Sequence, residues 1–292
     1  MIQSMQVLLL GLMLGGVFAL MASGLTLIFG VMGIVNLAHA AFMVLAAYIS
    51  FHLFQAYGLD PIISIVVVAP AMFVVGLVTY QVLFARVAGA GVKARAMTVL
   101  LTFALALVLE GGMGFVFTNM YRSTTPIYAS SAIVFEPFYI PEAQLYATLI
   151  SVVILVALWA FLQFTRAGYA IRATMHNRTA AQVVGVNVER ISMLVFGIGM
   201  ALAGASGAIL SFLFTFYPGK HWEWVAILLS LVVLGGMGSL LGALIGAVSL
   251  SVVAAFVSSH YGPTWSPVTF YLALFLILLV RPQGLLGKKP EM

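Results

Sequence analysis

The sequence predicts an all-α integral membrane protein, a polytopic helical bundle of roughly 8 to 9 spans at about 20 apolar residues each. Of its 292 residues, 64% are hydrophobic and only 7% are charged, whereas soluble domains carry about 25% charged residues. The chain has no cysteine, which excludes disulfides, thiolate nucleophiles and Cys-ligated metals. We expect one transmembrane domain over residues 1–292, with no metal site and no cofactor.

The first element is expected to be a retained span. Residues 1–59 contain no Lys, Arg, Asp or Glu, and the opening MIQSMQ lacks the basic segment of a secretory signal peptide. Further apolar stretches follow along the whole chain. The predicted stretches are 6–31, 36–57, 62–85, 96–118, 145–165, 191–217, 225–238, 240–258 and 267–281.

Basic residues alternate between the predicted connections. Lys and Arg in short loops are retained on the cytoplasmic side of the membrane. Ten of the 12 basic residues lie in three connections, and the opposite connections hold the other two beside several acids. We therefore expect a periplasmic N-terminus, a cytoplasmic C-terminus and no nucleic-acid partner for the net charge of +5. The ten are Arg86, Lys93, Arg95, Arg166, Arg172, Arg178, Arg190, Arg281, Lys288 and Lys289; the two are Arg122 and Lys220.

The stretch 225–258 must enter the membrane from outside and return outside, because an inward span follows it. Its 34 residues are too few for two crossings of about 20 residues each. We expect short or re-entrant helices near 233–243, with the break at Gly235, Gly236 and Gly238. Non-helical backbone at membrane depth requires burial in protein or contact with water, and it is a pointer to a substrate route.

A second break is predicted near 30–40, where Gly30, Gly33 and Asn36 interrupt an apolar run. Short or re-entrant helices are expected here too. Four positions recur in register between the two breaks, which indicates either two related halves or a chance match in a chain rich in small residues. The positions are Gly30, Met32, Gly33 and Ala38, matched by Gly235, Met237, Gly238 and Ala243.

Three polar residues are candidates for a translocation route, because polar groups in a membrane are unfavourable unless paired or solvated. Asn36 and His39 lie about one helical turn apart, so they can bond one another or a passing ligand. Alternatively they satisfy the backbone at the break. Glu110 is the carboxylate expected within a span. It lines a water-filled route or pairs with a helix end or hydroxyl.

The loop 166–190 is predicted to form two short helices. Asn177 is a suitable N-cap for the second helix, and Gly185 is a natural stop. Ala170, Ala173, Ala181 and Val184 predict a stripe of small residues, with Arg172 on a neighbouring face. Two readings stay open, a surface that fits a groove of another protein and an ordinary structured loop.

Four motifs carry a resemblance to a known family. They are GLTLIFGVMGIVNLAHAAF (24–42), RATMHNRTAAQVVGVN (172–187), VLGGMGSLLGALIGA (233–247) and LLVRPQGLLG (278–287). Together they resemble the permease subunits of branched-chain amino acid ABC importers over essentially the full chain. The loop resembles the EAAxxxG signature of such permeases, with Thr179 in place of the Glu. The resemblance implies that Arg172, Asn177, Ala181 and Gly185 belong to a coupling loop that contacts an ATPase subunit.

The resemblance also implies a set of partners and a location. They are two cytoplasmic ATP-binding subunits, a homologous second permease subunit and a periplasmic solute-binding protein, in the bacterial inner membrane. The chain has no P-loop, since GLLGKK at 284–289 has the wrong spacing. We expect a non-catalytic subunit that moves branched-chain amino acids or a related small polar solute such as urea or an amide.

Two other functions are compatible with parts of the sequence. GASG at 204–207 resembles the nucleophile motif of rhomboid intramembrane serine proteases, with Ser206 as nucleophile and His260 as the available base. A small-residue packing site explains the same motif. The other alternative is an ion-coupled secondary transporter, which needs intramembrane ionisable groups such as Glu110.

Overall fold

The computed structural model describes residues 2–85, 92–281 and 283–285, except for the side chains of 92–95. Arg86, Lys288 and Lys289, used above for orientation, lie outside the described residues. Within the described ranges, 8 helices are long and apolar enough to cross a membrane. The expected all-α polytopic bundle is therefore confirmed.

The long helices follow the predicted apolar stretches closely. Their bounds are α1 Ile2–Met32, α2 His39–Tyr57, α3 Pro61–Thr79 with a π-helical continuation η1 Tyr80–Phe84, α5 Val92–Phe117, α6 Glu142–Phe164, α9 Val188–Leu213, α11 Leu240–Tyr261 and α12 Ser266–Val280. The shorter elements are η2 Ile127–Ala129, β1 Ala132–Phe135, β2 Phe138–Pro141, α7 Arg166–His176, α8 Arg178–Val183, η3 Pro218–Lys220, α10 His221–Gly235 and η4 Pro263–Trp265.

Helix boundaries are set by the local sequence. Before α3, the Asp60 carboxylate accepts from the backbone N–H of Ile62 at 2.8 Å, and Pro61 occupies the first turn. Gly58 ends α2 with a φ of +66°, a conformation that glycine adopts without strain. The Ser239 hydroxyl caps α11 by accepting from the Gly242 N–H at 3.0 Å. Capping residues thus separate apolar runs that composition alone would join.

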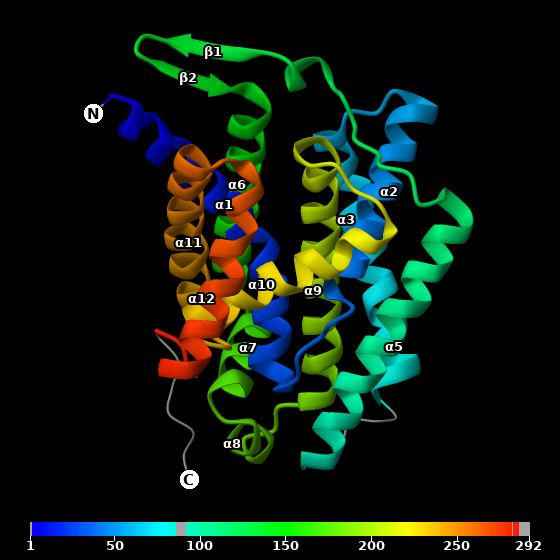
Figure 1. Cartoon of the computed structure of the whole chain (residues 1–292). Coiled ribbons are helices and arrows are strands. Elements are labelled where there is room, and N and C mark those ends of the chain that lie inside the picture. Colours follow the sequence, from blue (N-terminus) through cyan, green and yellow to red (C-terminus); the bar gives the residue numbers. More distant parts are fainter. Residues whose placement is uncertain (1, 86–91, 282, 286–292) are drawn as a thin grey trace.

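The two ends of the bundle differ in structure (Figure 1). One end carries the antiparallel hairpin β1–β2, in which Phe135 pairs with Phe138, and α1 begins at this end. The opposite end carries α7 and α8, and α12 ends on that side. At the hairpin end, the Tyr128 hydroxyl donates to Asp60 at 3.0 Å. Burial, with the Asp60 carboxylate beside it, raises the pKa of Tyr128, so the phenol stays protonated.

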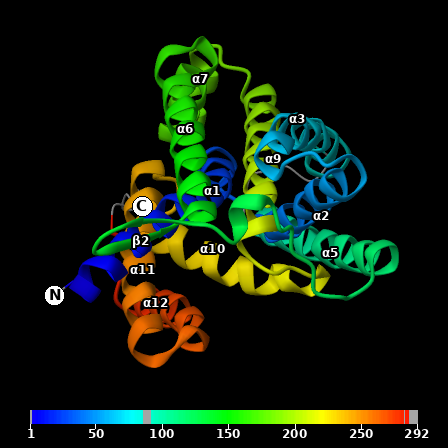
Figure 2. The same cartoon turned by 90° about the horizontal axis from the view of Figure 1, so that it is seen from above.

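Close approach of small residues determines which helices pair. The main pairings are α1 with α11 and α9 with α2 and α3, and Figure 2 shows α1 with α6, α10 and α11 around it. A Cβ added at Gly11 would meet Val252 Cα at 2.8 Å, and one at Gly15 would meet Val248 Cα at 2.8 Å. Small side chains let spans approach to backbone contact, which is how membrane helices gain packing energy.

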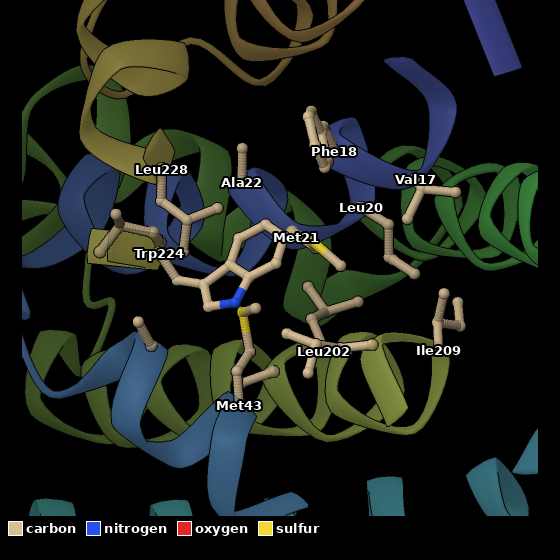
Figure 3. Close-up of a cluster of buried hydrophobic side chains, with 14 of the residues drawn as sticks. Val17, Phe18, Leu20, Met21, Ala22, Met43, Leu202, Ile209, Trp224 and Leu228 are labelled. Carbon is tan, nitrogen blue, oxygen red and sulfur yellow. The ribbon is translucent and has the colours of Figure 1, made fainter. Parts of the chain in front are cut away.

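The buried core lies where α1, α2, α9 and α10 meet. Trp224 of α10 is 3% exposed and packs edge-on to Phe18 of α1, with ring centroids 5.9 Å apart. Figure 3 shows the indole between Leu228, Met21 and Met43, with Leu202 of α9 close by. The oblique helix α10 therefore contributes its largest side chain to the centre of the bundle.

The break near 233–243 is where the sequence predicts it. α10 ends at Gly235 after 15 residues, and α11 begins at Leu240. The Gly235 backbone packs against Gly242, and Gly246 lies against the Leu231 carbonyl. The small residues thus serve helix packing, and α10 is the short helix of the pair.

Four helices flank the two breaks, namely α1 and α2 at the first and α10 and α11 at the second. The prediction that such helices are short is wrong for three of them. α11 has 22 residues, α1 has 31 and α2 has 19, and each qualifies as a span. Around the first break the chain is non-helical between Met32 and His39. The interruption at 30–40 therefore connects two complete helices and creates no re-entrant one, because α1 extends well beyond the apolar minimum of about 20 residues.

Replacing Gly235 by leucine is expected to destabilise the protein, because the new side chain meets the Gly242 backbone and neither helix can yield. We expect a loss of about 1–3 kcal/mol, measured as a lower unfolding temperature in detergent. Gly111→Leu is the matched control, since nothing lies within 4 Å of a Cβ at Gly111. Equal unfolding temperatures for the two variants would contradict this packing role.

Candidate functional site

The loop between α6 and α9 forms the two predicted short helices. The Thr165 hydroxyl accepts from the Gly168 N–H at 3.0 Å at the start of α7. Asn177 caps α8 by accepting from the Ala180 N–H at 2.9 Å. Gly185 has a φ of +91°, and its N–H donates to the Gln182 carbonyl at 3.0 Å. Asn177 and Gly185 thus define the two ends of α8.

The predicted stripe of small residues does not form one exposed face. Ala181 is 3% exposed, and α8 packs against α9, whereas Val184 is 76% exposed. The exposed surface of α8 instead presents Val183 and Val184. On α7, the Arg172 guanidinium lies over the Tyr169 ring at 4.9 Å, a cation–π contact. Ala181 therefore lies on the side of α8 that packs against the bundle, while Arg172 lies nearer the surface.

The end of α7 contacts the first helix break, and the two breaks contact each other. A Cβ added at Gly30 would collide with the terminal methyl group of Met175 and lie 3.4 Å from Gly238 Cα. On the far side of the second break, a Cβ at Gly284 would collide with the Val233 carbonyl and lie 2.5 Å from Gly236 Cα. We call Gly30, Met175, Gly236, Gly238 and Gly284 the inner junction.

Backbone conformation at the breaks requires glycine. Gly33 has a φ of +67°, Gly236 of +99° and Gly238 of +86°, values that residues with a Cβ rarely adopt. Gly33 and Gly238 are corresponding positions of the match between the two breaks. The C-terminal segment holds the second break in place, since the Leu285 N–H donates to the Leu234 carbonyl at 2.8 Å.

Asn36 and His39 are buried in the core at the first break, 2% and 1% exposed. The Asn36 side-chain oxygen accepts from the Ala38 N–H at 3.1 Å, while its amide nitrogen has no hydrogen-bond partner. The side chains of Asn36 and His39 do not hydrogen-bond to each other. The two residues are joined through the backbone instead, since the His39 N–H donates to the Asn36 carbonyl at 3.2 Å. Asn36 therefore satisfies the interrupted backbone.

Glu110 connects α5 to the beginning of α10. Its carboxylate accepts from the Trp222 indole N–H at 3.0 Å and lies 3.9 Å from His221 Nε2. The side chain is 31% exposed. Of the two roles considered for Glu110, pairing with a helix end is the one this geometry supports, because α10 begins at His221.

The GASG segment lies inside α9 and packs against α2. Ser206 is fully buried and its hydroxyl has no hydrogen-bond partner. A Cβ at Gly207 would collide with the Met43 carbonyl. His260 Nδ1 is engaged with the Phe256 carbonyl at 2.9 Å. Among the described residues, no base is hydrogen-bonded to Ser206, so the segment has the geometry of a packing site.

Sequence patterns did not identify Met175, Trp222 or Gly284 as contact residues. A methionine at the end of a short helix and a glycine near the C-terminus carry no local signal, since their partners are remote in sequence. Gly284 lies in the motif LLVRPQGLLG (278–287), which contributes to the family resemblance but does not predict what the glycine contacts.

A family model for branched-chain amino acid transport system permease components matches residues 7–280. The chain belongs to this family. This permease is 28% identical to the high-affinity branched-chain amino acid permease protein LivH of Escherichia coli K12, over 96% of this chain and 94% of that protein. It is 27% identical to BraD of Pseudomonas aeruginosa, over 98% and 96%. It is also 26% identical to a probable LivH of Methanocaldococcus jannaschii, over 92% and 88%.

The permease also resembles a solved structure, PsaBC from Streptococcus pneumoniae in complex with Fab. The TM-score is 0.50 at 14% sequence identity, covering 94% of this chain and 91% of that one. The likeness concerns the fold alone. The family match and the apolar helices together make this chain a membrane-embedded permease subunit of a transport system.

Asn177→Ala is expected to unfold α8 locally. The substitution removes the cap from a helix of 6 residues, and a cap contributes about 1 kcal/mol. Amide hydrogen exchange at Ala180–Val183 should accelerate several-fold. Asn187→Ala removes the corresponding cap of α9 and should leave exchange beyond the first turn of that long helix unchanged. Unaltered exchange in α8 would show that the cap is dispensable.

Proposed function

We propose that this permease is the membrane-spanning subunit of an ATP-driven importer, with residues 1–292 as one transmembrane unit. It has no nucleotide-binding motif of its own. ATP-binding subunits on the side of α7 and α8 supply the energy. A homologous permease subunit completes the pathway, and an external binding protein delivers the solute.

The basic residues of the loop support this orientation. Arg166, Arg172, Arg178 and Arg190 gather at the end of the bundle that carries α7 and α8, and Lys and Arg near span ends are retained in the cytoplasm. The N-terminus then lies on the periplasmic side of the bacterial inner membrane and the C-terminus on the cytoplasmic side. The hairpin β1–β2 faces the binding protein.

The contact of Met175 with Gly30 carries the proposed mechanism. The loop that faces the ATPase touches, through one side chain, the inner end of α1 and thereby Gly238 at the second break. Movement of α7 therefore displaces both breaks together. ATP-driven closure of the partner subunits biases a two-state equilibrium of the permease between inward-open and outward-open arrangements. Arg172 and the exposed Val183 and Val184 contact the ATPase directly.

The transported solute is a branched-chain amino acid. The names of the relatives LivH and BraD support this assignment. The interior of the permease is mostly apolar and has few polar groups. Such an interior suits transient passage of the solute, because the external binding protein provides the affinity for it. Asn36, His39 and Glu110 hold the breaks and α10 in position for the route and do not form a tight binding site.

Met175→Ala is expected to uncouple ATP hydrolysis from uptake, because it removes the side chain that joins the loop to Gly30. The transporter should assemble and hydrolyse ATP, while solute imported per ATP falls about fivefold or more. The measurement is coupled uptake in proteoliposomes that contain all subunits. Met120→Ala is the control, since Met120 is 67% exposed and lies in the loop after α5. Equal coupling ratios in both variants would refute the role of Met175.

Uptake by the complete transporter is expected to follow ATP and not the proton gradient. An ionophore that dissipates the gradient at constant ATP should leave the initial rate unchanged, because Glu110 is committed to Trp222. Omission of ATP should abolish accumulation. Collapse of uptake with the gradient alone would instead establish an ion-coupled carrier.

A further inference from the structure

A cavity of about 410 Å³ lies in the half of the bundle nearer the hairpin. It is partly open and is lined by the first part of α1, the last part of α11, the first turns of α6 and α12, and Phe214 after α9. Its volume falls within the range of about 300–1,000 Å³ typical of small-molecule sites. Asn36, His39 and Glu110 do not line this cavity.

Three aromatic rings form an apolar wall of this cavity. Phe18 stacks with Phe214 at 6.2 Å between ring centroids and lies edge-on to Phe270 at 5.6 Å. Beyond them Trp224 packs on Phe18 and Phe214. Because the rings support one another, the wall is rigid and offers a preformed surface to an aliphatic group.

The rest of the lining combines aliphatic side chains of α1 and α11 with polar groups that carry no charge. The Gln144 amide among them already donates to the Leu10 carbonyl at 2.8 Å. Hydroxyl groups follow α11 at Ser251, Ser258 and Ser259, and Ser266 faces them from the first turn of α12. Ser251 is 2% exposed and its hydroxyl has no hydrogen-bond partner. Among the described residues, every side chain that lines the cavity is uncharged. A buried hydroxyl without a partner is unfavourable, so Ser251 has an unused capacity to bind a polar group.

Helix ends provide charge complementarity along the serine row. Ser258 and Ser259 lie in the last turns of α11, whose end carries partial negative charge, and Ser266 begins α12, whose start carries partial positive charge. A zwitterion therefore finds both of its charges matched. The serine row is about 10 Å long from Ser251 to Ser258, since α11 rises about 1.5 Å per residue. This length accommodates an amino acid of moderate size. A lipid acyl chain would leave Ser251 without a partner.

We propose that this cavity is an outward-facing subsite that selects the solute, an inference that rests on the proposed function. The branched aliphatic side chain lies against Phe18, Phe214 and Phe270. The ammonium and carboxylate groups lie along the serines, with Ser251 as a hydrogen-bonding residue. The permease thus adds its own selection for side-chain size to that of the binding protein.

The test compares Ser251→Ala, Ser258→Leu and the control Ser249→Leu in proteoliposomes of the complete transporter. Ser249 lies on α11 but is exposed and outside the cavity. Uptake of leucine and of alanine is measured for each variant. Ser258→Leu reduces the space, so the leucine-to-alanine rate ratio should fall about tenfold or more. Ser251→Ala keeps the space and should raise the KM for leucine up to about tenfold.

The control should retain the leucine-to-alanine ratio of the unmodified transporter. An unchanged ratio in Ser258→Leu, with normal leucine uptake by the unmodified transporter, would overturn the subsite alone. If Ser258→Leu instead transports normally but loses a copurifying phospholipid, the cavity holds a lipid chain, and the subsite is overturned as well. Failure of the unmodified transporter to import leucine would overturn the proposed function and the subsite together.

Discussion

Contact between backbones at glycine is the constraint on which the rest of this structure depends. In a membrane, helices gain little from hydrophobic burial and pack through close approach instead. Gly11 and Gly15 bring α1 against α11, and Gly235 with Gly242 joins α10 to α11. These contacts place both helix breaks beside each other at Gly30 and Gly238. With larger residues at these positions, the two breaks could not contact each other beside Met175 of α7.

Much of this architecture follows from composition, charge and local signals. Apolar length predicts the spans because lipid requires each one to satisfy its own backbone. The caps at Asn177 and Gly185 were predictable since capping is a local interaction within a few residues. The distribution of Lys and Arg predicts that the loop 166–190 and the connection after α5 lie at opposite ends of the bundle. In the structure, α7 and α8 of that loop lie opposite the hairpin.

The candidate site was predictable only in part, because its decisive contacts join residues remote in sequence. Met175 meets Gly30, and Glu110 meets Trp222, through pairings that no periodicity encodes. Helical spacing predicts the stripe of small residues but does not reveal which side of a short helix meets the protein, and Ala181 lies against the bundle. The aromatic wall and the serine row combine side chains from several helices, and their proximity depends on the packing of the whole bundle.

The partnership of α1 with α11 has a consequence for biosynthesis. The first helix leaves the ribosome long before its main neighbour exists, and the two are more than two hundred positions apart along the chain. Until then, the small-residue face of α1 must be covered by lipid or by the insertion machinery. Contacts of such separation form slowly. Completion of the core therefore waits for the C-terminal quarter of the polypeptide, and truncated products lack the surface that would retain the first helix.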